Sequence, residues 1–118
     1  DNHMQVITAS HLTKDDVAIG ISHSGSSKDI VEALKIARKN GATTISITNK
    51  GKSPIVKESN ITLFTASDET SYSILGLNSR IAQLAIINSI YYYIVYHQTG
   101  HDSEARSITE KALQSKKF

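Results

Sequence analysis

The chain has 118 residues, a length that suits one domain with its own hydrophobic core. Its 13 Lys and Arg against 11 Asp and Glu give a net charge of +2, too small to indicate nucleic-acid binding by charge alone. The absence of cysteine excludes disulfides, thiolate metal sites and a cysteine nucleophile. No apolar run is long enough to cross a membrane and no signal peptide opens the sequence, so we expect a soluble, cytoplasmic protein.

The first half of the chain alternates between extended and helical patterns. The predicted elements are a helix over residues 4–12, a strand over 17–21, a helix over 27–39, a strand over 44–47, a short helix from Ser53-Pro54 and a strand over 61–64. This alternation is typical of right-handed crossovers between parallel strands. We therefore predict an α/β fold with a parallel sheet.

The last third is helical and more apolar. We predict a helix over residues 78–97, a stop at Gly100, and a final helix from about 102 to 116. A helix that is apolar on most sides must be buried against more than its own small sheet. Tyr91-Tyr92-Tyr93 and Tyr96 suit a dimer face, and packing inside the monomer is the alternative.

The residues with the clearest chemistry lie between the first strand and the next helix. The segment Ser22-His23-Ser24-Gly25-Ser26-Ser27 places hydroxyls and backbone N–H groups at a helix N-terminus, where an anion such as phosphate is favoured. Gly25 lets the backbone approach the ligand, and the serines donate hydrogen bonds without carrying charge. The alternative is that Ser26 or Ser27 is an ordinary N-cap.

Polar residues also follow the other two predicted strands, at 48–49 and 65–67. Ligands of parallel sheets bind outside the carboxyl ends of the strands, so this rule and the serine segment indicate the same edge. Residues 66–72 then form either a loop over the site or a plain connection.

The segment Ser22 to Ser27 resembles S-x-S-G-x-[ST], the phosphosugar-binding signature of the SIS (sugar isomerase) domain. The segment Asn78-Ser79-Arg80-Ile81-Ala82-Gln83-Leu84 is similar to one found in RpiR-type bacterial transcription regulators, and the opening Asp1-Asn2-His3-Met4-Gln5 fits them too. Those regulators join an N-terminal helix-turn-helix domain to a C-terminal SIS domain that senses a sugar phosphate. The resemblance implies a three-layer α/β/α fold of the flavodoxin or Rossmann type over residues 1–118.

The resemblance also implies a set of site residues. The expected ligand-binding residues are Ser22, Ser24, Gly25, Ser26, Ser27, Thr48, Ser79 and Arg80. Ser22, Ser24 and Ser27 are expected to bind the phosphate, with Gly25 giving backbone access. Arg80, Thr48 and the N-terminal turn that is not found here are expected to read the sugar end. For Arg80 the alternative is an ion pair with Asp68 or Glu69.

Two features depart from the family. Its members begin with an earlier strand and a G-x-G-x-S turn that is not found here, so we expect a fragment without that strand-turn-helix and without a helix-turn-helix domain. Asn88 stands where the regulators are expected to carry aspartate.

No convincing catalytic pair emerges. His23, Glu32, Glu69 and His97 are the candidate bases, and the histidines form no metal-binding pattern, so neither a catalytic residue nor a metal or cofactor is expected. We predict a sensor domain that binds a phosphorylated sugar, forms a homodimer or higher oligomer, and meets DNA only through an N-terminal domain outside this chain. The alternatives are a phosphosugar isomerase or etherase of the same fold, and a dimerising module with a vestigial pocket.

Overall fold

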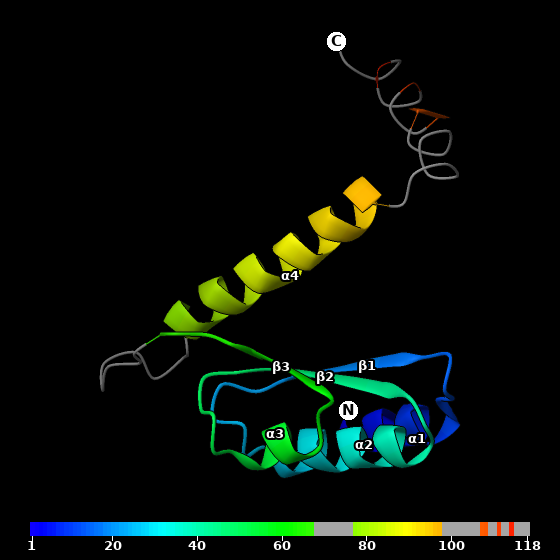
Figure 1. Ribbon diagram of the computed structural model, residues 1–118, viewed down its shortest axis with the longest axis vertical. Helices are drawn as coiled ribbons and strands as arrows, with labels where there is room; N and C mark the ends of the chain where they lie inside the picture. Colours follow the sequence, from blue (N-terminus) through cyan, green and yellow to red (C-terminus); the bar gives the residue numbers. More distant parts are fainter. Residues whose placement is uncertain (68–76, 98–106, 109–110, 112–113, 115–118) are drawn as a thin grey trace. The chain divides into compact units, whose positions relative to one another are not determined.

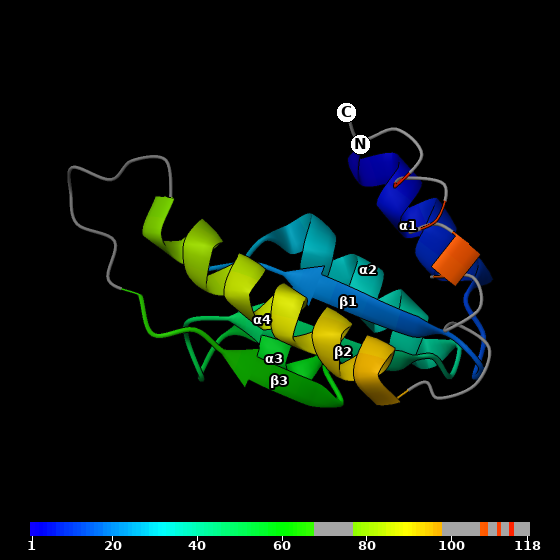
Figure 2. The same cartoon turned by 90° about the horizontal axis from the view of Figure 1, so that it is seen from above.

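The computed structural model describes residues 1–67, 77–97, 107–108, 111 and 114. The chain divides into two units, residues 1–84 and 85–118, and helix α4 (Leu77–His97) runs from the first into the second. The first unit contains a sheet of three strands, β1 (Val17–Ile21), β2 (Thr43–Thr48) and β3 (Ile61–Phe64). They lie in the order β1-β2-β3, and both pairs are parallel, which confirms the predicted class (Figure 2).

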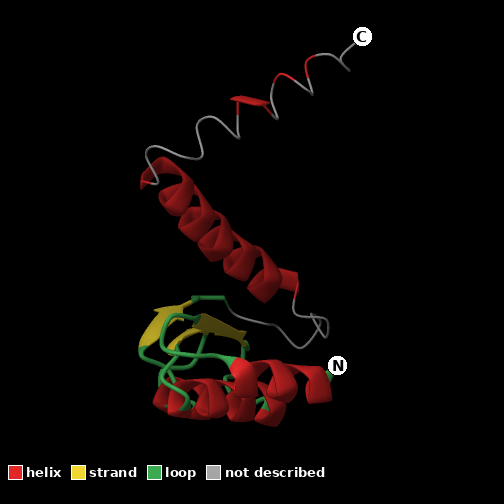
Figure 3. Ribbon diagram, turned by 90° about the vertical axis from the view of Figure 1, so that its right-hand side faces the viewer, coloured by secondary structure: helices red, strands yellow, loops and turns green. Residues whose placement is uncertain are grey.

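Three helices cover one face of this sheet (Figures 1 and 3): α1 (Asn2–His11), α2 (Lys28–Lys39) and α3 (Pro54–Lys57). Small residues let α1 and α2 approach each other, and Ala9, Ala37 and Ala42 form a buried cluster there. Gly20 does the same for β1 and α2, because a Cβ at that position would lie 2.6 Å from a methyl carbon of Leu34. The helix layer therefore fits closely against the strands.

The central strand presents hydroxyls, rather than aliphatic groups, to the helices. Thr44, Ser46 and Thr48 of β2 are fully buried, and each hydroxyl donates a hydrogen bond. Thr44 is also joined to Asn60, because its N–H donates to Asn60 Oδ1 at 2.8 Å and its carbonyl accepts from Asn60 N at 2.8 Å. Since every one of these groups has a partner, burying them costs little.

The opposite face of the sheet is aliphatic. Val17 and Ile19 of β1 and Ile61 of β3 are about half exposed, at 58%, 51% and 49%. Parallel sheets are normally covered on both faces. The exposed residues of this face are thus the ones that a second layer would cover.

Helix α4 exposes large apolar side chains along its length. Those more than half exposed are Ile81, Leu84, Tyr91, Tyr92, Tyr93 and Tyr96. Tyr93 stacks on His97 with ring centroids 4.1 Å apart. Among the residues described, no helix is long and apolar enough to span a membrane.

The predicted strands at 17–21 and 61–64 match β1 and β3, and the predicted helices match α2 and α4 to within one residue. Helix α1 begins at Asn2, two residues before the predicted start, because the Asp1 side chain accepts from His3 N and caps it. Strand β2 is one residue longer at each end than predicted, since Thr43 and Thr48 continue the pairing. Of the predicted final helix, only residues 107, 108, 111 and 114 are described, and all four are helical.

Candidate functional site

The turn between β1 and α2 is built around Gly25. Its φ of 65° lies in the left-handed region that favours glycine. A Cβ there would overlap the side chain of Ser53 and lie 2.9 Å from Thr48 Oγ1. The Gly25 N–H donates to the carbonyl and the hydroxyl of Ser22, each at 3.1 Å, and closes the turn. Both the backbone angle and the packing therefore require glycine at this position.

The carbonyl oxygens of this turn are held by partners within the protein. The Ser22 carbonyl accepts from Gly25, the His23 carbonyl accepts from Asn49 N at 3.1 Å, and the Gly25 carbonyl accepts from Ile55 N at 3.0 Å. Carbonyl oxygens repel an anion, whereas N–H and O–H groups attract one. A carbonyl that already accepts a hydrogen bond repels an anion less, so these three contacts favour an anion at the turn.

The four serines of the turn fall into two pairs. Ser22 is buried, and its hydroxyl lies 3.0 Å from the hydroxyl of Ser27. Ser24, Ser26 and Ser27 are exposed, and both the N–H and the hydroxyl of Ser26 donate to Ser24, to its Oγ and its carbonyl, each at 3.3 Å. Ser27 occupies the N-cap position of α2, but its side chain makes no capping hydrogen bond. The alternative in which Ser27 serves as an ordinary N-cap is not what this geometry shows.

The helix that follows adds a favourable potential. Helix α2 has 12 residues and starts at Lys28, directly after the serines. The first N–H groups of a helix carry a partial positive charge that favours an anion. The exposed Lys28 adds a full positive charge, and Asp29 adds a negative one in the same turn.

Hydrogen bonds tie the carboxyl ends of the three strands together. The Thr48 hydroxyl donates to the His23 carbonyl at 3.3 Å, and the Thr48 carbonyl accepts from Thr65 N at 2.9 Å. The Asn49 side chain donates to the Ser67 carbonyl at 2.6 Å. The three polar segments that the sequence placed at one edge are therefore joined there.

The structure brings together most of the predicted ligand-binding residues, namely Ser22, Ser24, Gly25, Ser26, Ser27 and Thr48. Ser79 and Arg80 lie on α4, where Ser79 is buried and Arg80 is exposed. Thr48 is fully buried and its hydroxyl supports the turn, so its direct contact with a ligand stays a prediction. Asp68 and Glu69, the alternative partners of Arg80, lie outside the described residues, as does most of the loop at 66–72.

Ser53 is a supporting residue that the sequence analysis did not single out for the site. It precedes α3, is 4% exposed, and donates from Oγ to the Lys50 carbonyl at 2.6 Å. Its side chain fills the space beside Gly25. The only local signal was the Ser53-Pro54 pair, which predicts a helix start and says nothing of this tertiary contact.

The candidate bases lie on different elements. His23 belongs to the serine turn, Glu32 is exposed on α2, and His97 is exposed on α4, while Glu69 is outside the described residues. Within the described part of the chain, no group of three or more His, Asp and Glu side chains is arranged to hold a metal ion.

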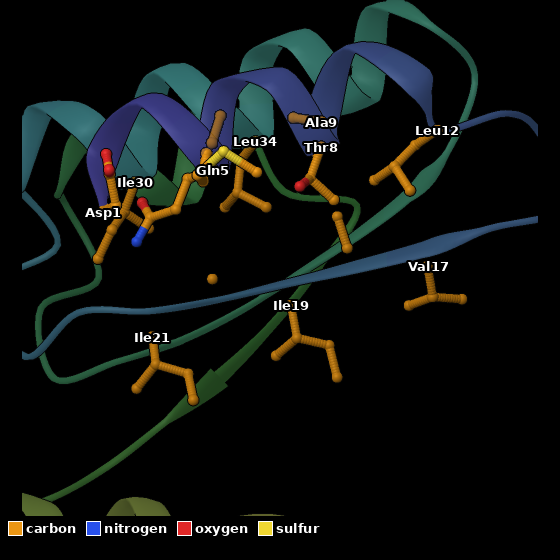
Figure 4. Close-up of a pocket in the computed structure, with 14 residues that line it drawn as sticks. Asp1, Gln5, Thr8, Ala9, Leu12, Val17, Ile19, Ile21, Ile30 and Leu34 are labelled. Carbon is orange, nitrogen blue, oxygen red and sulfur yellow. The ribbon is translucent and has the colours of Figure 1, made fainter.

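A separate groove of about 670 Å³ runs beside β1 (Figure 4). It is lined by α1, β1 and α2, with Met4, Leu12, Val17 and Leu34 among its apolar residues. None of the predicted ligand-binding residues lines it. The groove is thus distinct from the polar edge.

Comparison with known proteins gives a family match and full-length relatives. A family model described as SIS domain matches residues 3–92. An uncharacterized HTH-type transcriptional regulator of Caldanaerobacter subterraneus subsp. tengcongensis is 46% identical over 120 residues, which cover 100% of this chain and 42% of the relative. A second uncharacterized HTH-type regulator, from Haemophilus influenzae, is 34% identical over 113 residues, 96% of this chain and 38% of the relative. The chain thus spans less than half the length of these relatives.

Two solved structures share the fold. The Vibrio vulnificus NanR protein complexed with ManNAc-6P has a TM-score of 0.81 at 22% identity, over 97% of this chain and 43% of that one. The sugar isomerase domain of an RpiR transcription factor from Sphaerobacter thermophilus has a TM-score of 0.73 at 22% identity, over 94% of this chain and 58% of that one. At these identities the likeness concerns the fold alone.

Proposed function

The chain belongs to the SIS domain family, and on that premise we propose that it is the sugar-phosphate-sensing effector domain of a bacterial RpiR-type transcription regulator. The observation that carries the proposal is the turn at 22–27, whose carbonyls at 22, 23 and 25 are occupied and whose exposed serines precede the N-terminus of α2. The phosphate binds there, with the exposed Ser24 and Ser27 donating from the solvent side and the buried Ser22 from beneath.

The regulator part of the proposal is supported by the relatives. Both full-length matches are HTH-type regulators, and the NanR structure that shares this fold holds a sugar phosphate. In the longer protein, DNA binding belongs to a helix-turn-helix domain outside residues 1–118. The effector prefers one of two arrangements of the domain and thereby shifts how the DNA-binding parts are held. Such a protein works in the cytoplasm.

Self-association is also part of the proposal. The tyrosines and aliphatic side chains that α4 exposes suit an interface between two copies that includes Tyr91, Tyr92, Tyr93 and Tyr96. A twofold dimer would place two sensors and two DNA-binding domains in register with a palindromic operator. Light scattering during size-exclusion chromatography measures this directly, and a monomer at high protein concentration contradicts it.

We propose that further residues of the longer protein complete the sheet beside β1. The support is the apolar groove along that strand, together with the greater length of the relatives (Figure 4). Those residues would also supply the G-x-G-x-S turn of the family and so complete the sugar end of the pocket. Residues 1–118 would then be one part of a longer domain.

The experiment is a thermal-shift comparison of glucose with glucose 6-phosphate, N-acetylglucosamine 6-phosphate and N-acetylmannosamine 6-phosphate. A ligand that binds only the folded state raises the unfolding midpoint, so the phosphorylated sugars should raise it and glucose should not. Equal shifts for glucose and glucose 6-phosphate would refute the proposal. No shift with any sugar phosphate supports the vestigial-pocket alternative instead.

The same ligands distinguish a sensor from an isomerase. An isomerase exchanges a carbon-bound proton of its sugar phosphate with solvent, and NMR in D₂O detects that exchange. We expect binding without exchange, because the sequence shows no convincing catalytic pair. Exchange catalysed by the chain would assign it to the enzymes of the family.

A further inference from the structure

Two buried hydroxyls at the end of β3 lack a hydrogen-bond partner. Thr65 is 5% exposed, and neither its Oγ1 nor the Oγ of Ser67 has a partner in the described part of the chain. Buried hydroxyls are normally paired, and those of Thr44, Ser46 and Thr48 in the same sheet are. The exception at the end of β3 therefore requires an explanation.

Their position suggests one. Thr65 N donates to the Thr48 carbonyl at 2.9 Å, and the Ser67 carbonyl accepts from the Asn49 side chain at 2.6 Å. Asn49 N in turn donates to the His23 carbonyl, which belongs to the serine turn. The backbones that carry the two hydroxyls are thus fixed at the edge that holds the turn, and both hydroxyls are buried there without a partner.

We propose that Thr65, assisted by Ser67, is a specificity-determining residue that hydrogen-bonds a hydroxyl or acylamino group of the sugar whose phosphate lies at the turn. This inference rests on the proposed function and adds the part of the site that reads the sugar. A site with a buried polar group rejects analogues that leave the group unpaired. The pairing of Thr65 by the ligand would therefore select among sugars that carry the same phosphate.

The test uses Thr65→Val, which removes the hydroxyl and keeps the branched shape, with Thr44→Val as a matched control. In the ligand-free chain, Thr65→Val should leave the thermal midpoint unchanged or raise it, because no internal partner is lost. Thr44→Val should lower it by about 4–8 °C, because the hydroxyl of Thr44 is paired with Glu58 and Asn60. A loss of stability in Thr65→Val equal to that in Thr44→Val would overturn the inference.

Calorimetry then distinguishes contacts with the sugar from contacts with the phosphate. For the sugar phosphate that binds the wild-type chain best, Thr65→Val should lose affinity by at least about fivefold, and Ser67→Ala by less. Inorganic phosphate should bind wild type and Thr65→Val alike. Equal losses for both probes, or no loss for either, would overturn the inference while leaving the proposed function standing. A wild-type chain that binds no sugar phosphate would overturn both.

Discussion

Two strand-to-helix turns lie at the same edge of the sheet and differ in what they leave exposed. The turn from β1 to α2, at 22–27, ends with two exposed serines before a helix of 12 residues. The turn from β2 to α3, at 49–53, ends with the buried Ser53 before a helix of four residues that starts at Pro54. The first leaves serine side chains exposed, whereas the second directs its hydroxyl inward to the Lys50 carbonyl.

The second turn supports the first. The Ser53 side chain occupies the space that a Cβ on Gly25 would need, and Ile55 N donates to the Gly25 carbonyl. A binding turn whose donors are already ordered binds more tightly, because ordering them on binding would reduce the binding free energy. The difference between the two turns therefore shows a division between residues that present donors and residues that position them.

The largest effect should come from Gly25→Ala. The left-handed backbone angle and the overlap with Ser53 together predict a loss of about 2 kcal/mol or more in the free energy of unfolding. Urea denaturation measures it. Sugar-phosphate binding by the folded fraction should also weaken, because the turn must shift to admit the methyl group.

The matched control for that variant is Gly51→Ala in the other turn. A Cβ on Gly51 would meet only the ring of Phe64, at 3.8 Å, and no strained backbone angle is involved. We expect a change within about 0.5 kcal/mol. If both glycine variants lose stability equally, the backbone angle and the packing at Gly25 do not make it more sensitive to substitution than Gly51.

Ser24→Ala should reduce affinity rather than stability. Its hydroxyl is exposed, and removing a hydrogen bond to a charged group costs about 1–3 kcal/mol of binding. Calorimetry with the best sugar phosphate gives the affinity, and the unfolding midpoint without ligand should stay at the wild-type value. Unaltered affinity would mean that the serines serve only the turn.

Ser53→Ala should give the opposite pattern. It removes the hydrogen bond to the Lys50 carbonyl from a buried position, which costs about 1 kcal/mol of stability. Affinity should change less than for Ser24→Ala, because Ser53 positions the turn without touching the ligand. Comparable losses of affinity in the two variants would show that Ser24 and Ser53 do not have separate roles in contacting the ligand and in supporting the turn.

The smallest effect concerns the opposite edge of the sheet. The N–H and the hydroxyl of Thr13 donate to the Asp16 carboxylate at 2.8 and 2.9 Å and hold the pKa of Asp16 below its ordinary value of 3.8. Because the folded pKa is lowered, this contribution to stability is present above the ordinary pKa and is lost as pH falls through the folded one. The midpoint difference between wild type and Asp16→Asn should therefore shrink in strong acid.

The Asp16→Asn variant also tests which edge of the sheet binds the sugar phosphate. Asp16 precedes β1, at the end of the strand away from the serines, so Asp16→Asn should leave sugar-phosphate affinity at neutral pH unchanged. A clear loss of affinity would argue that binding is not confined to the carboxyl edge.

Local sequence was enough to predict β1, β3 and the serine turn. The apolar runs at 17–21 and 61–64 are bounded by polar residues, and the turn's donors are contiguous in the chain. Strand β2 was predicted too short because its terminal threonines look like loop residues until their pairing is known.

The parts of the site that sequence did not reveal depend on contacts between distant residues. Thr48 stays a predicted ligand residue, and sequence did not reveal that its hydroxyl also donates to the His23 carbonyl. Ser53 looked like a helix cap because its contact with Gly25 joins two turns. Ser22 and Ser27 looked like two separate donors, and their mutual hydrogen bond appears only in the folded turn.

The bonds between Thr44 and Asn60 have a consequence for how the sheet assembles. Strand β2 alternates hydroxyl and aliphatic residues, so a folding chain can pair β3 with it two residues out of step and still bury the same kinds of side chain. Asn60 then meets a different residue and loses the N–H, hydroxyl and carbonyl of Thr44 at once. The hydrogen bonds between Thr44 and Asn60 therefore favour the native register of β2 and β3 over a shifted one. They do so at the end of the sheet away from the serines.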